Sequence, residues 1–225
     1  MTTSPASFAS DDLVRRVAAN LERVRARLAS GERGPAGVRV VAVTKAFGPE
    51  MVRAAAAVGL DAVGENYLDE LVAKRVATSD VDVRWHFLGA LQSNKIAELV
   101  GVADVLCSVS RDKEIDKIAS SGAAVVYVQV DCTGAPSRNG AAPGDVAGLV
   151  QRARERGLDV RGLMTVAPAD ERGAREAFHI TRDLADELGL VERSMGMSDD
   201  LEIASEFGTT EVRVGRALFG PRTDA

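Results

Sequence analysis

The stretch VAVTKAFGP, residues 41–49, joins a run of apolar residues to a lysine and then to a glycine–proline pair. Short apolar runs rich in β-branched residues are typical of buried strands. We therefore predict a strand over 38–43 and an alanine-rich helix over 49–58, with Lys45 in the turn between them. A lysine at this place either reaches into solvent or faces a site, and the rest of the chain decides between the two.

The same strand–turn–helix unit recurs along the chain. Strands are predicted at 38–43, 61–64, within 81–88, and at 105–108, 124–130, 160–164, 194–197 and 211–214. Helices are predicted at 11–29, 49–58, 67–77, 93–100, 111–120, 143–156, 173–188 and 198–207, with a terminal turn at 216–219. Strict alternation of strands and helices makes the strands parallel. Eight such units in roughly 190 residues predict a single α/β domain, a compact (β/α)8 TIM barrel with an extra N-terminal helix.

Composition narrows the class of protein. The chain has 225 residues, of which 46% are hydrophobic and 27% charged, and this is typical of a globular protein. A net charge of −5 argues against nucleic acid as the partner. Residues 1–12 lack the pattern of a secretory signal, and the apolar run at 54–60 is too short to cross a bilayer. We expect one domain over 1–225 with a flexible segment at 1–10, no membrane contact and a cytoplasmic location.

The number and spacing of the cysteines also indicate a cytoplasmic location. Cys107 and Cys132 form no CxxC motif, and two thiols in an acidic chain without a signal are typical of a reducing cytoplasm. We expect both to be small core residues, and no metal site is expected.

The predicted barrel also predicts where the polar residues that follow its strands lie. In TIM barrels the functional residues gather where the strands end, at the carboxyl face. Polar or special residues follow every predicted strand, at Lys45, 65–66, 86–92, 107–108, 131–139, 164–165, 197–198 and 215–216. We therefore expect all of them around one mouth.

Lys45 has two interpretations at that mouth. It is a solvated loop residue, or it is an amine that attacks a carbonyl, because partial burial lowers the pKa of a lysine and frees its neutral form. The carbonyl partner would be an aldolase-type substrate or pyridoxal phosphate.

The end of the chain suggests a phosphate site. SMGMSDD (194–200) and VRVGRALFG (212–220) follow the seventh and eighth strands, where barrels commonly bind phosphate. Gly215 would let the backbone approach an anion, and Ser198 would offer a hydroxyl; the alternative is a tight turn and a helix N-cap. Asp199 and Asp200 would repel phosphate unless they point away from it at the first turn of a helix.

Arg213 lies inside the last predicted strand. By alternation its side chain faces opposite to Val212 and Val214, either into the barrel or under the helices. Both places are costly for an unpartnered guanidinium, so Arg213 needs a partner, and a cofactor ring is one.

Six motifs together carry a resemblance to a known family. They are VTK at 43–45, GENYLDE at 64–70, WHFLGALQSNK at 85–95, RGLMTV at 161–166, GMSDD at 196–200 and VRVGRALFG at 212–220. In this order they resemble the pyridoxal phosphate homeostasis protein family of YggS type, which is similar to the N-terminal barrel of alanine racemase. The resemblance runs from the first helix to Phe219.

The resemblance implies pyridoxal 5′-phosphate as the cofactor, and it implies roles for seven residues. Lys45 would hold the cofactor as an imine, Ser198, Gly215 and Arg216 would lie near its phosphate, and Asn66 and Arg213 near its ring. Met197 is also expected to bind the cofactor. No catalytic residue is implied. His86 is expected to orient its neighbours, and His179 to be a surface or packing residue. Residues 137–139 are Ser-Arg-Asn where the family often has a lysine, which leaves the role of Arg138 open.

The chemistry favours a carrier over a catalyst. A cationic arginine beside the pyridine nitrogen disfavours its protonation, and an unprotonated ring is a poorer electron sink. Racemisation also needs an acid or base opposite the lysine, and the only tyrosines are Tyr67 and Tyr127. We expect a monomeric carrier in vitamin B6 and amino-acid homeostasis, with apo-enzymes that use the cofactor as possible recipients. The alternatives are a fold-type III racemase or lyase, and a lysine-dependent barrel acting on a phosphorylated sugar.

Overall fold

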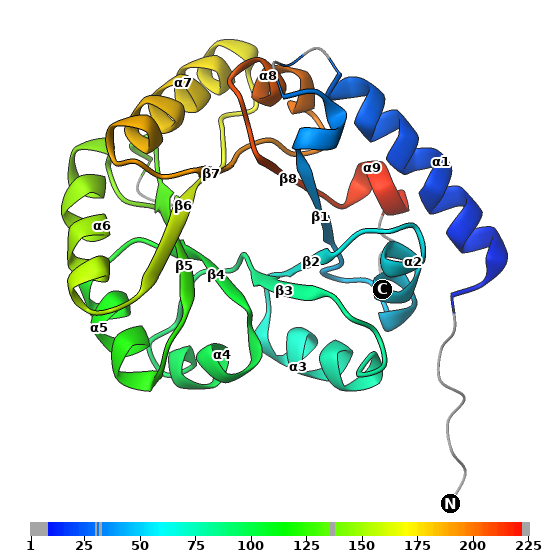
Figure 1. Ribbon diagram of the computed structural model, residues 1–225, viewed down its shortest axis with the longest axis horizontal. Coiled ribbons are helices and arrows are strands. Elements are labelled where there is room, and N and C mark those ends of the chain that lie inside the picture. The colour runs from blue at the N-terminus through cyan, green and yellow to red at the C-terminus, as the bar shows by residue number, and fades with distance from the viewer. Residues whose placement is uncertain (1–8, 30, 32, 136–137, 222–225) are drawn as a thin grey trace, which may run out of the picture.

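Eight parallel strands close into a barrel in the computed structural model, which describes residues 9–29, 31, 33–135 and 138–221 (Figure 1). The strands are β1 (Arg39–Val43), β2 (Ala62–Glu65), β3 (Arg84–Phe87), β4 (Val105–Val109), β5 (Val125–Val130), β6 (Asp159–Thr165), β7 (Glu192–Ser194) and β8 (Glu211–Val214). Each strand pairs with the next in sequence, and β8 closes the ring on β1 with Arg213 opposite Val41. The predicted TIM barrel is confirmed.

The helices form an outer ring around the barrel (Figure 1). They are α1 (Asp11–Arg27), α2 (Pro49–Ala57), α3 (Leu68–Ala77), α4 (Ile96–Val102), α5 (Asp112–Ser121), α6 (Val146–Glu155), α7 (Glu171–Glu187), α8 (Leu201–Glu206) and α9 (Arg216–Phe219), with short 3-10 turns η1 (Pro35–Gly37) and η2 (Pro143–Asp145). Their apolar faces meet the outer faces of the strands in one large core. A separate cluster of Val105, Cys107, Tyr127 and Met164 fills part of the barrel interior.

The extra N-terminal helix packs against the helix ring and is hydrogen-bonded to the last helix, α9. Ser10 caps α1 by accepting from the Leu13 amide at 3.2 Å, and Leu13, Val17, Leu21 and Val24 bury one face of the helix. Asn20 on the same helix donates to the carbonyl oxygen of Leu218 on α9 at 2.8 Å. Of the stretch 1–10 expected to be flexible, residues 1–8 lie outside the described residues.

Two predicted boundaries near the phosphate motif were wrong. The strand expected at 194–197 ends at Ser194, because Gly196 has a φ of 100°, which a strand does not allow. The helix expected at 198–207 begins only at Leu201, so Ser198 lies in the turn before it and Asp200 occupies the N-cap position. Elsewhere, α4 continues through Gly101, the residue expected to end it, and stops at Val102.

Neither cysteine is paired; Cys107 is buried and Cys132 half-buried, in line with the core role expected for them. None of the described helices combines the length and the apolar character needed to cross a bilayer.

Candidate functional site

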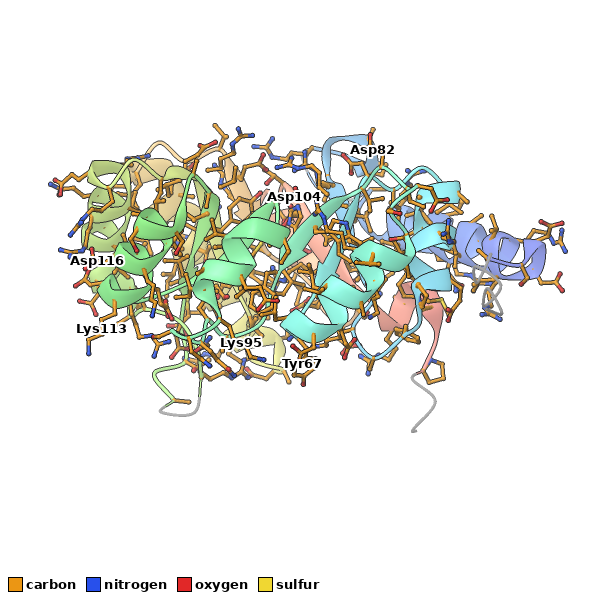
Figure 2. All side chains as sticks on the ribbon, turned by 90° about the horizontal axis from the view of Figure 1, so that it is seen from below. Tyr67, Asp82, Lys95, Asp104, Lys113 and Asp116 are labelled. Carbon is orange, nitrogen blue, oxygen red and sulfur yellow. The ribbon has the colours of Figure 1, made fainter. Side chains whose placement is uncertain are left out.

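A cavity of about 610 Å³ opens at the carboxyl ends of the strands. Apolar side chains of β1, β6 and neighbouring loops form part of its wall, including Val43, Phe47, Leu88, Met164 and Val166. The seven residues predicted to bind the cofactor all line it: Lys45, Asn66, Met197, Ser198, Arg213, Gly215 and Arg216. Figure 2 shows Tyr67, Lys95 and Lys113 on this same side of the molecule, with Asp82 and Asp104 on the opposite side.

Lys45 is the one lysine that reaches this cavity. The sequence contains five lysines, and all of them are described. Lys74 is buried behind β1 and bound to Glu65 and Glu70, while Lys95 lies near Asp69 at 3.7 Å. Lys113 and Lys117 belong to α5 in the outer ring. An amine for attack on a carbonyl ligand can therefore come only from Lys45 in this cavity.

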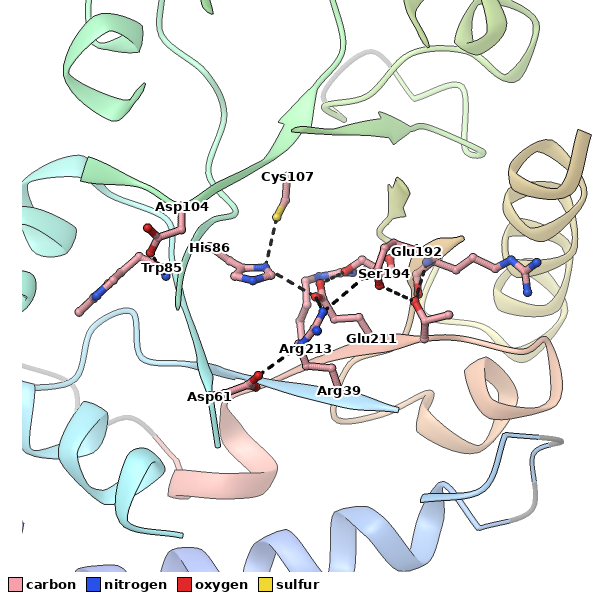
Figure 3. Close-up of polar contacts among 12 residues, drawn as sticks. Arg39, Asp61, Trp85, His86, Asp104, Cys107, Glu192, Ser194, Glu211 and Arg213 are labelled. Carbon is pink, nitrogen blue, oxygen red and sulfur yellow. Dashed lines mark hydrogen bonds and ion pairs between the residues drawn. The ribbon is translucent and has the colours of Figure 1, made fainter. Parts of the chain in front are cut away.

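Arg213 points into the barrel, which decides between the two orientations left open by the sequence. Its Nη1 donates to the carbonyl oxygen of Ser194 at 2.7 Å and to the Ser194 hydroxyl at 2.8 Å, and its Nη2 donates to the carbonyl oxygen of Thr165 at 2.6 Å. Burial lowers the pKa of Arg213, and the nearby Glu211 carboxylate opposes that shift. These partners hold a cation at the lining of the cavity. Figure 3 shows the contact between Arg213 and Ser194.

Ser198, Gly215 and Arg216 form the other end of the cavity. The amide of Ala217, in the first turn of α9, donates to the Ser198 hydroxyl at 3.2 Å. A Cβ atom at Gly215 would lie 3.0 Å from the carbonyl oxygen of Val43, so glycine allows β8 and β1 to come close here. Backbone amides, a hydroxyl and the exposed guanidinium of Arg216 together suit an anion.

Of the two aspartates beside this end, Asp200 points away from the cavity and Asp199 does not. Asp199 precedes α8, lines the cavity and forms an ion pair with Arg216, so its charge is balanced there rather than pointed away. Asp200 turns back and accepts from the Met197 amide, and burial raises the pKa of its carboxyl group.

The barrel interior below Arg213 holds polar residues that the sequence analysis did not single out. Glu211 is fully buried, accepts from the Ser194 hydroxyl at 2.7 Å and lies 3.7 Å from Nδ1 of His86 (Figure 3). Glu211 and Arg213 are two residues apart on one strand, so alternation alone would have placed them on the same face. No feature of the sequence indicated that Ser194 would bind Glu211 and Arg213.

His86 is neutral in this interior. Burial and the charges of Arg84 and Arg39 lower its pKa to about 3. It contacts Cys107, whose Sγ lies 3.6 Å from Nδ1. It lies within the barrel and does not line the cavity, and its expected role in orienting its neighbours stays a prediction. His179 on α7 is exposed, next to Arg182 and Asp183.

A larger hollow of about 940 Å³ lies at the opposite, amino-terminal end of the barrel. It is lined by η1, α1 and charged residues of both signs, including Arg39, Asp61 and Glu192. In TIM barrels this end serves stability, and none of the seven predicted residues reaches it. In the part of the chain that the structure describes, no group of three or more His, Cys, Asp or Glu side chains is placed to hold a metal ion.

The donor set of the mouth cavity fits pyridoxal 5′-phosphate. An aldehyde needs an amine, an unprotonated pyridine nitrogen needs a hydrogen-bond donor, and a phosphate needs amides, hydroxyls or guanidinium groups. Lys45, Arg213 and the Ser198–Gly215 end supply these three in one cavity.

Comparison with known proteins gives first the class and then the family. Residues 14–223 match the family model for the alanine racemase N-terminal domain. The solved alanine racemase of Clostridium difficile shares this fold with a TM-score of 0.76 at 18% identity, over 94% of this chain and 57% of that one. The pyridoxal phosphate homeostasis protein of Pseudomonas aeruginosa is 39% identical over 92% of this chain and 96% of its own. The structure of PipY from Synechococcus elongatus with PLP bound has a TM-score of 0.80 and 30% identity, covering 91% of this chain and all of that one. The chain belongs to the pyridoxal phosphate homeostasis protein family.

Proposed function

We propose that this protein binds pyridoxal 5′-phosphate in the mouth cavity and carries it in vitamin B6 and amino-acid homeostasis, without turnover of its own. The observation that carries the proposal is the meeting of Lys45, Arg213 and the Ser198–Gly215 end around one cavity. The name and ligand of the relatives support it.

The seven residues would divide the work. Lys45 would hold the ligand as an imine, and Arg213 and Asn66 would lie at the ring. Ser198, Gly215, Arg216 and Met197 would surround the phosphate. When bound, the cofactor supplies an electron sink for reactions at the α-carbon of amino acids. Arg213 weakens that capacity, because a guanidinium cation beside the pyridine nitrogen disfavours its protonation.

The proposal also covers the location of the protein, its oligomeric state and the recipients of the cofactor. We expect a cytoplasmic monomer that passes the cofactor to apo-enzymes. Arg138, which donates to the carbonyl oxygen of Val166 at the cavity wall, cannot form an imine, so Lys45 alone would make and break the covalent bond. Ser137 beside it lies outside the described residues.

The test combines an absorbance spectrum with borohydride trapping of the cofactor-loaded protein. We expect a near-visible band and one modified peptide that contains Lys45. Lys45→Ala should lose both, while Lys113→Ala on the outer face of α5 should keep both. A protein without the band would favour the phosphorylated-sugar alternative. An unchanged trapping yield in Lys45→Ala would refute the assignment of Lys45.

A further inference from the structure

The backbone on both sides of Lys45 is held by one cluster of side chains from α3. Lys74 donates from Nζ to the carbonyl oxygen of Thr44 at 2.7 Å, directly before Lys45. Glu70 accepts from the amide of Ala46 at 2.9 Å, directly after it. The two side chains are four residues apart on α3, so they share a helix face and contact each other at 2.8 Å.

The cluster satisfies its buried lysine fully. The Lys74 ammonium has three donors, and they go to Thr44, to Glu70 and to Oε1 of Glu65 at 2.7 Å. The Thr44 hydroxyl donates to the same Glu65 oxygen at 2.6 Å. A buried ammonium without such partners would be strongly unfavourable, so its geometry is tightly determined.

Ala46 shows that the turn is held against its local preference. Among the described residues it is the only non-glycine with a positive φ, at 61°. For alanine this left-handed conformation costs roughly 1–2 kcal/mol and persists only where the surroundings impose it. Glu70 binds the amide of this residue, and the Phe47 amide closes the turn on the Thr44 carbonyl at 3.0 Å.

We propose that Glu70 and Lys74 are positioning residues for Lys45. They fix the two peptide units that flank it, and so they set the direction in which its side chain leaves β1 toward the mouth cavity. Neither Glu70 nor Lys74 lines that cavity, so neither would contact the ligand directly. The inference rests on the proposed function for the identity of the ligand. The hydrogen bonds from Lys74 to the Thr44 carbonyl and from the Ala46 amide to Glu70, which we call the clasp on Lys45, do not depend on that function.

The experiment compares two ligands of nearly the same shape. Pyridoxal 5′-phosphate has the aldehyde that reacts with Lys45, whereas 4-deoxypyridoxine 5′-phosphate has a methyl group there and cannot form the bond. Glu70→Ala removes the acceptor for the Ala46 amide. We expect it to weaken binding of the aldehyde by about tenfold or more, since small misplacements of a reacting group are costly. Binding of the deoxy compound should change less than about twofold.

Three variants complete the series. Glu70→Gln keeps an acceptor oxygen and should restore most of the aldehyde affinity. Asp69→Ala, on the exposed side of α3, should behave as the wild type. Lys74→Met together with Glu65→Gln removes the ammonium without leaving a buried carboxylate unpaired, and it should show the same aldehyde-selective loss.

The outcomes separate this proposal from its premise. Equal losses for both ligands, or no loss for either, would overturn the positioning role. If the wild type binds neither ligand, the proposed function fails. The positioning role is then tested without a ligand, by the rate and pH dependence of Lys45 acetylation with acetic anhydride, which peptide mass spectrometry measures. A changed pH midpoint in Glu70→Ala, restored in Glu70→Gln, supports the clasp, and identical profiles contradict it.

Discussion

Arg213 is bound to Ser194 through both the backbone and the side chain of the serine, at 2.7 Å and 2.8 Å. The same hydroxyl donates its single proton to Glu211 at 2.7 Å, so it can only accept from the arginine. The chain Glu211–Ser194–Arg213 therefore fixes the guanidinium before any ligand arrives (Figure 3). A preorganised cation loses little conformational entropy when a ring nitrogen binds to it.

The first prediction concerns this buried chain. Arg213→Met should lower the free energy of unfolding by about 3–5 kcal/mol. It leaves the buried carbonyl oxygens of Ser194 and Thr165 without their donor. It also removes one of the cations near the buried Glu211, which among the described residues keeps only Arg39 at 3.8 Å as an ion-pair partner. Urea denaturation measures the change. Adding Glu211→Gln to Arg213→Met should recover part of the loss, since a neutral amide has less need of the missing cation. Strictly additive effects of the two substitutions would show that the residues are not coupled.

The second prediction concerns the phosphate end. Pyridoxal should bind at least about tenfold more weakly than its phosphate, because hydrogen bonds to a charged group are worth roughly 1.5–3 kcal/mol each. Ser198→Ala should reduce the affinity for the phosphate form and leave that for pyridoxal unchanged. Equilibrium dialysis measures both, with Ser120→Ala on α5 as the control. Equal affinity for the two ligands in the wild type would contradict this placement.

The third prediction follows from the neutral His86. Its pKa is lowered to about 3 in the folded protein, whereas an unfolded histidine titrates near about 6.5. The unfolded state therefore binds the extra proton between these values. This group's contribution to stability is complete above about pH 6.5 and is lost as pH falls toward 3, by up to about 1.4 kcal/mol per unit.

His86→Gln should remove that slope, as measured by urea denaturation between about pH 4 and 7. The exposed His179→Gln is the matched control, because the chain has only these two histidines. Burial raises the pKa of Glu65, Glu211 and Asp200, and their stabilising contributions run the other way, present at low pH and lost as pH rises. The comparison therefore uses the difference in slope between each variant and the wild type. The same slope in His86→Gln and wild type would contradict the assignment to His86.

The barrel was predictable because its signal is local. Each strand is a short apolar run, each helix has its own period, and their alternation alone implies parallel pairing. The boundaries failed at 194–200, where a left-handed Gly196 ends the strand early and the following turn uses polar residues that resemble a helix start. Which of several polar residues caps a helix depends on backbone angles that the sequence does not state.

The site was predictable in part for a different reason. Residues at strand ends meet because the topology brings them together, so Lys45, Ser198 and Gly215 could be assigned to one mouth before their contacts were known. Arg213 lies inside a strand, and alternation alone left its orientation open. The clasp of Glu70 and Lys74 on Lys45 could not be predicted, because charged residues four apart on a helix usually form only a solvated pair. Only the packing of α3 against the turn after β1 buries Lys74 and directs it at a backbone carbonyl.

The last prediction is that the cofactor-loaded protein does not catalyse reactions of amino acids. Loaded wild-type protein should exchange the α-proton of alanine in deuterated water no faster than free pyridoxal 5′-phosphate. In the proposed binding mode Arg213 would disfavour protonation of the ring, and neither tyrosine lines the cavity as a partner opposite Lys45. Tyr127 is buried in the barrel, where burial further raises its pKa, and Tyr67 is exposed at the rim. Proton NMR of L-alanine, with chiral analysis of the product, measures the rate, and Lys45→Ala with the same cofactor concentration gives the background. Rapid exchange or racemisation at catalytic protein concentrations would replace the carrier with a racemase or lyase.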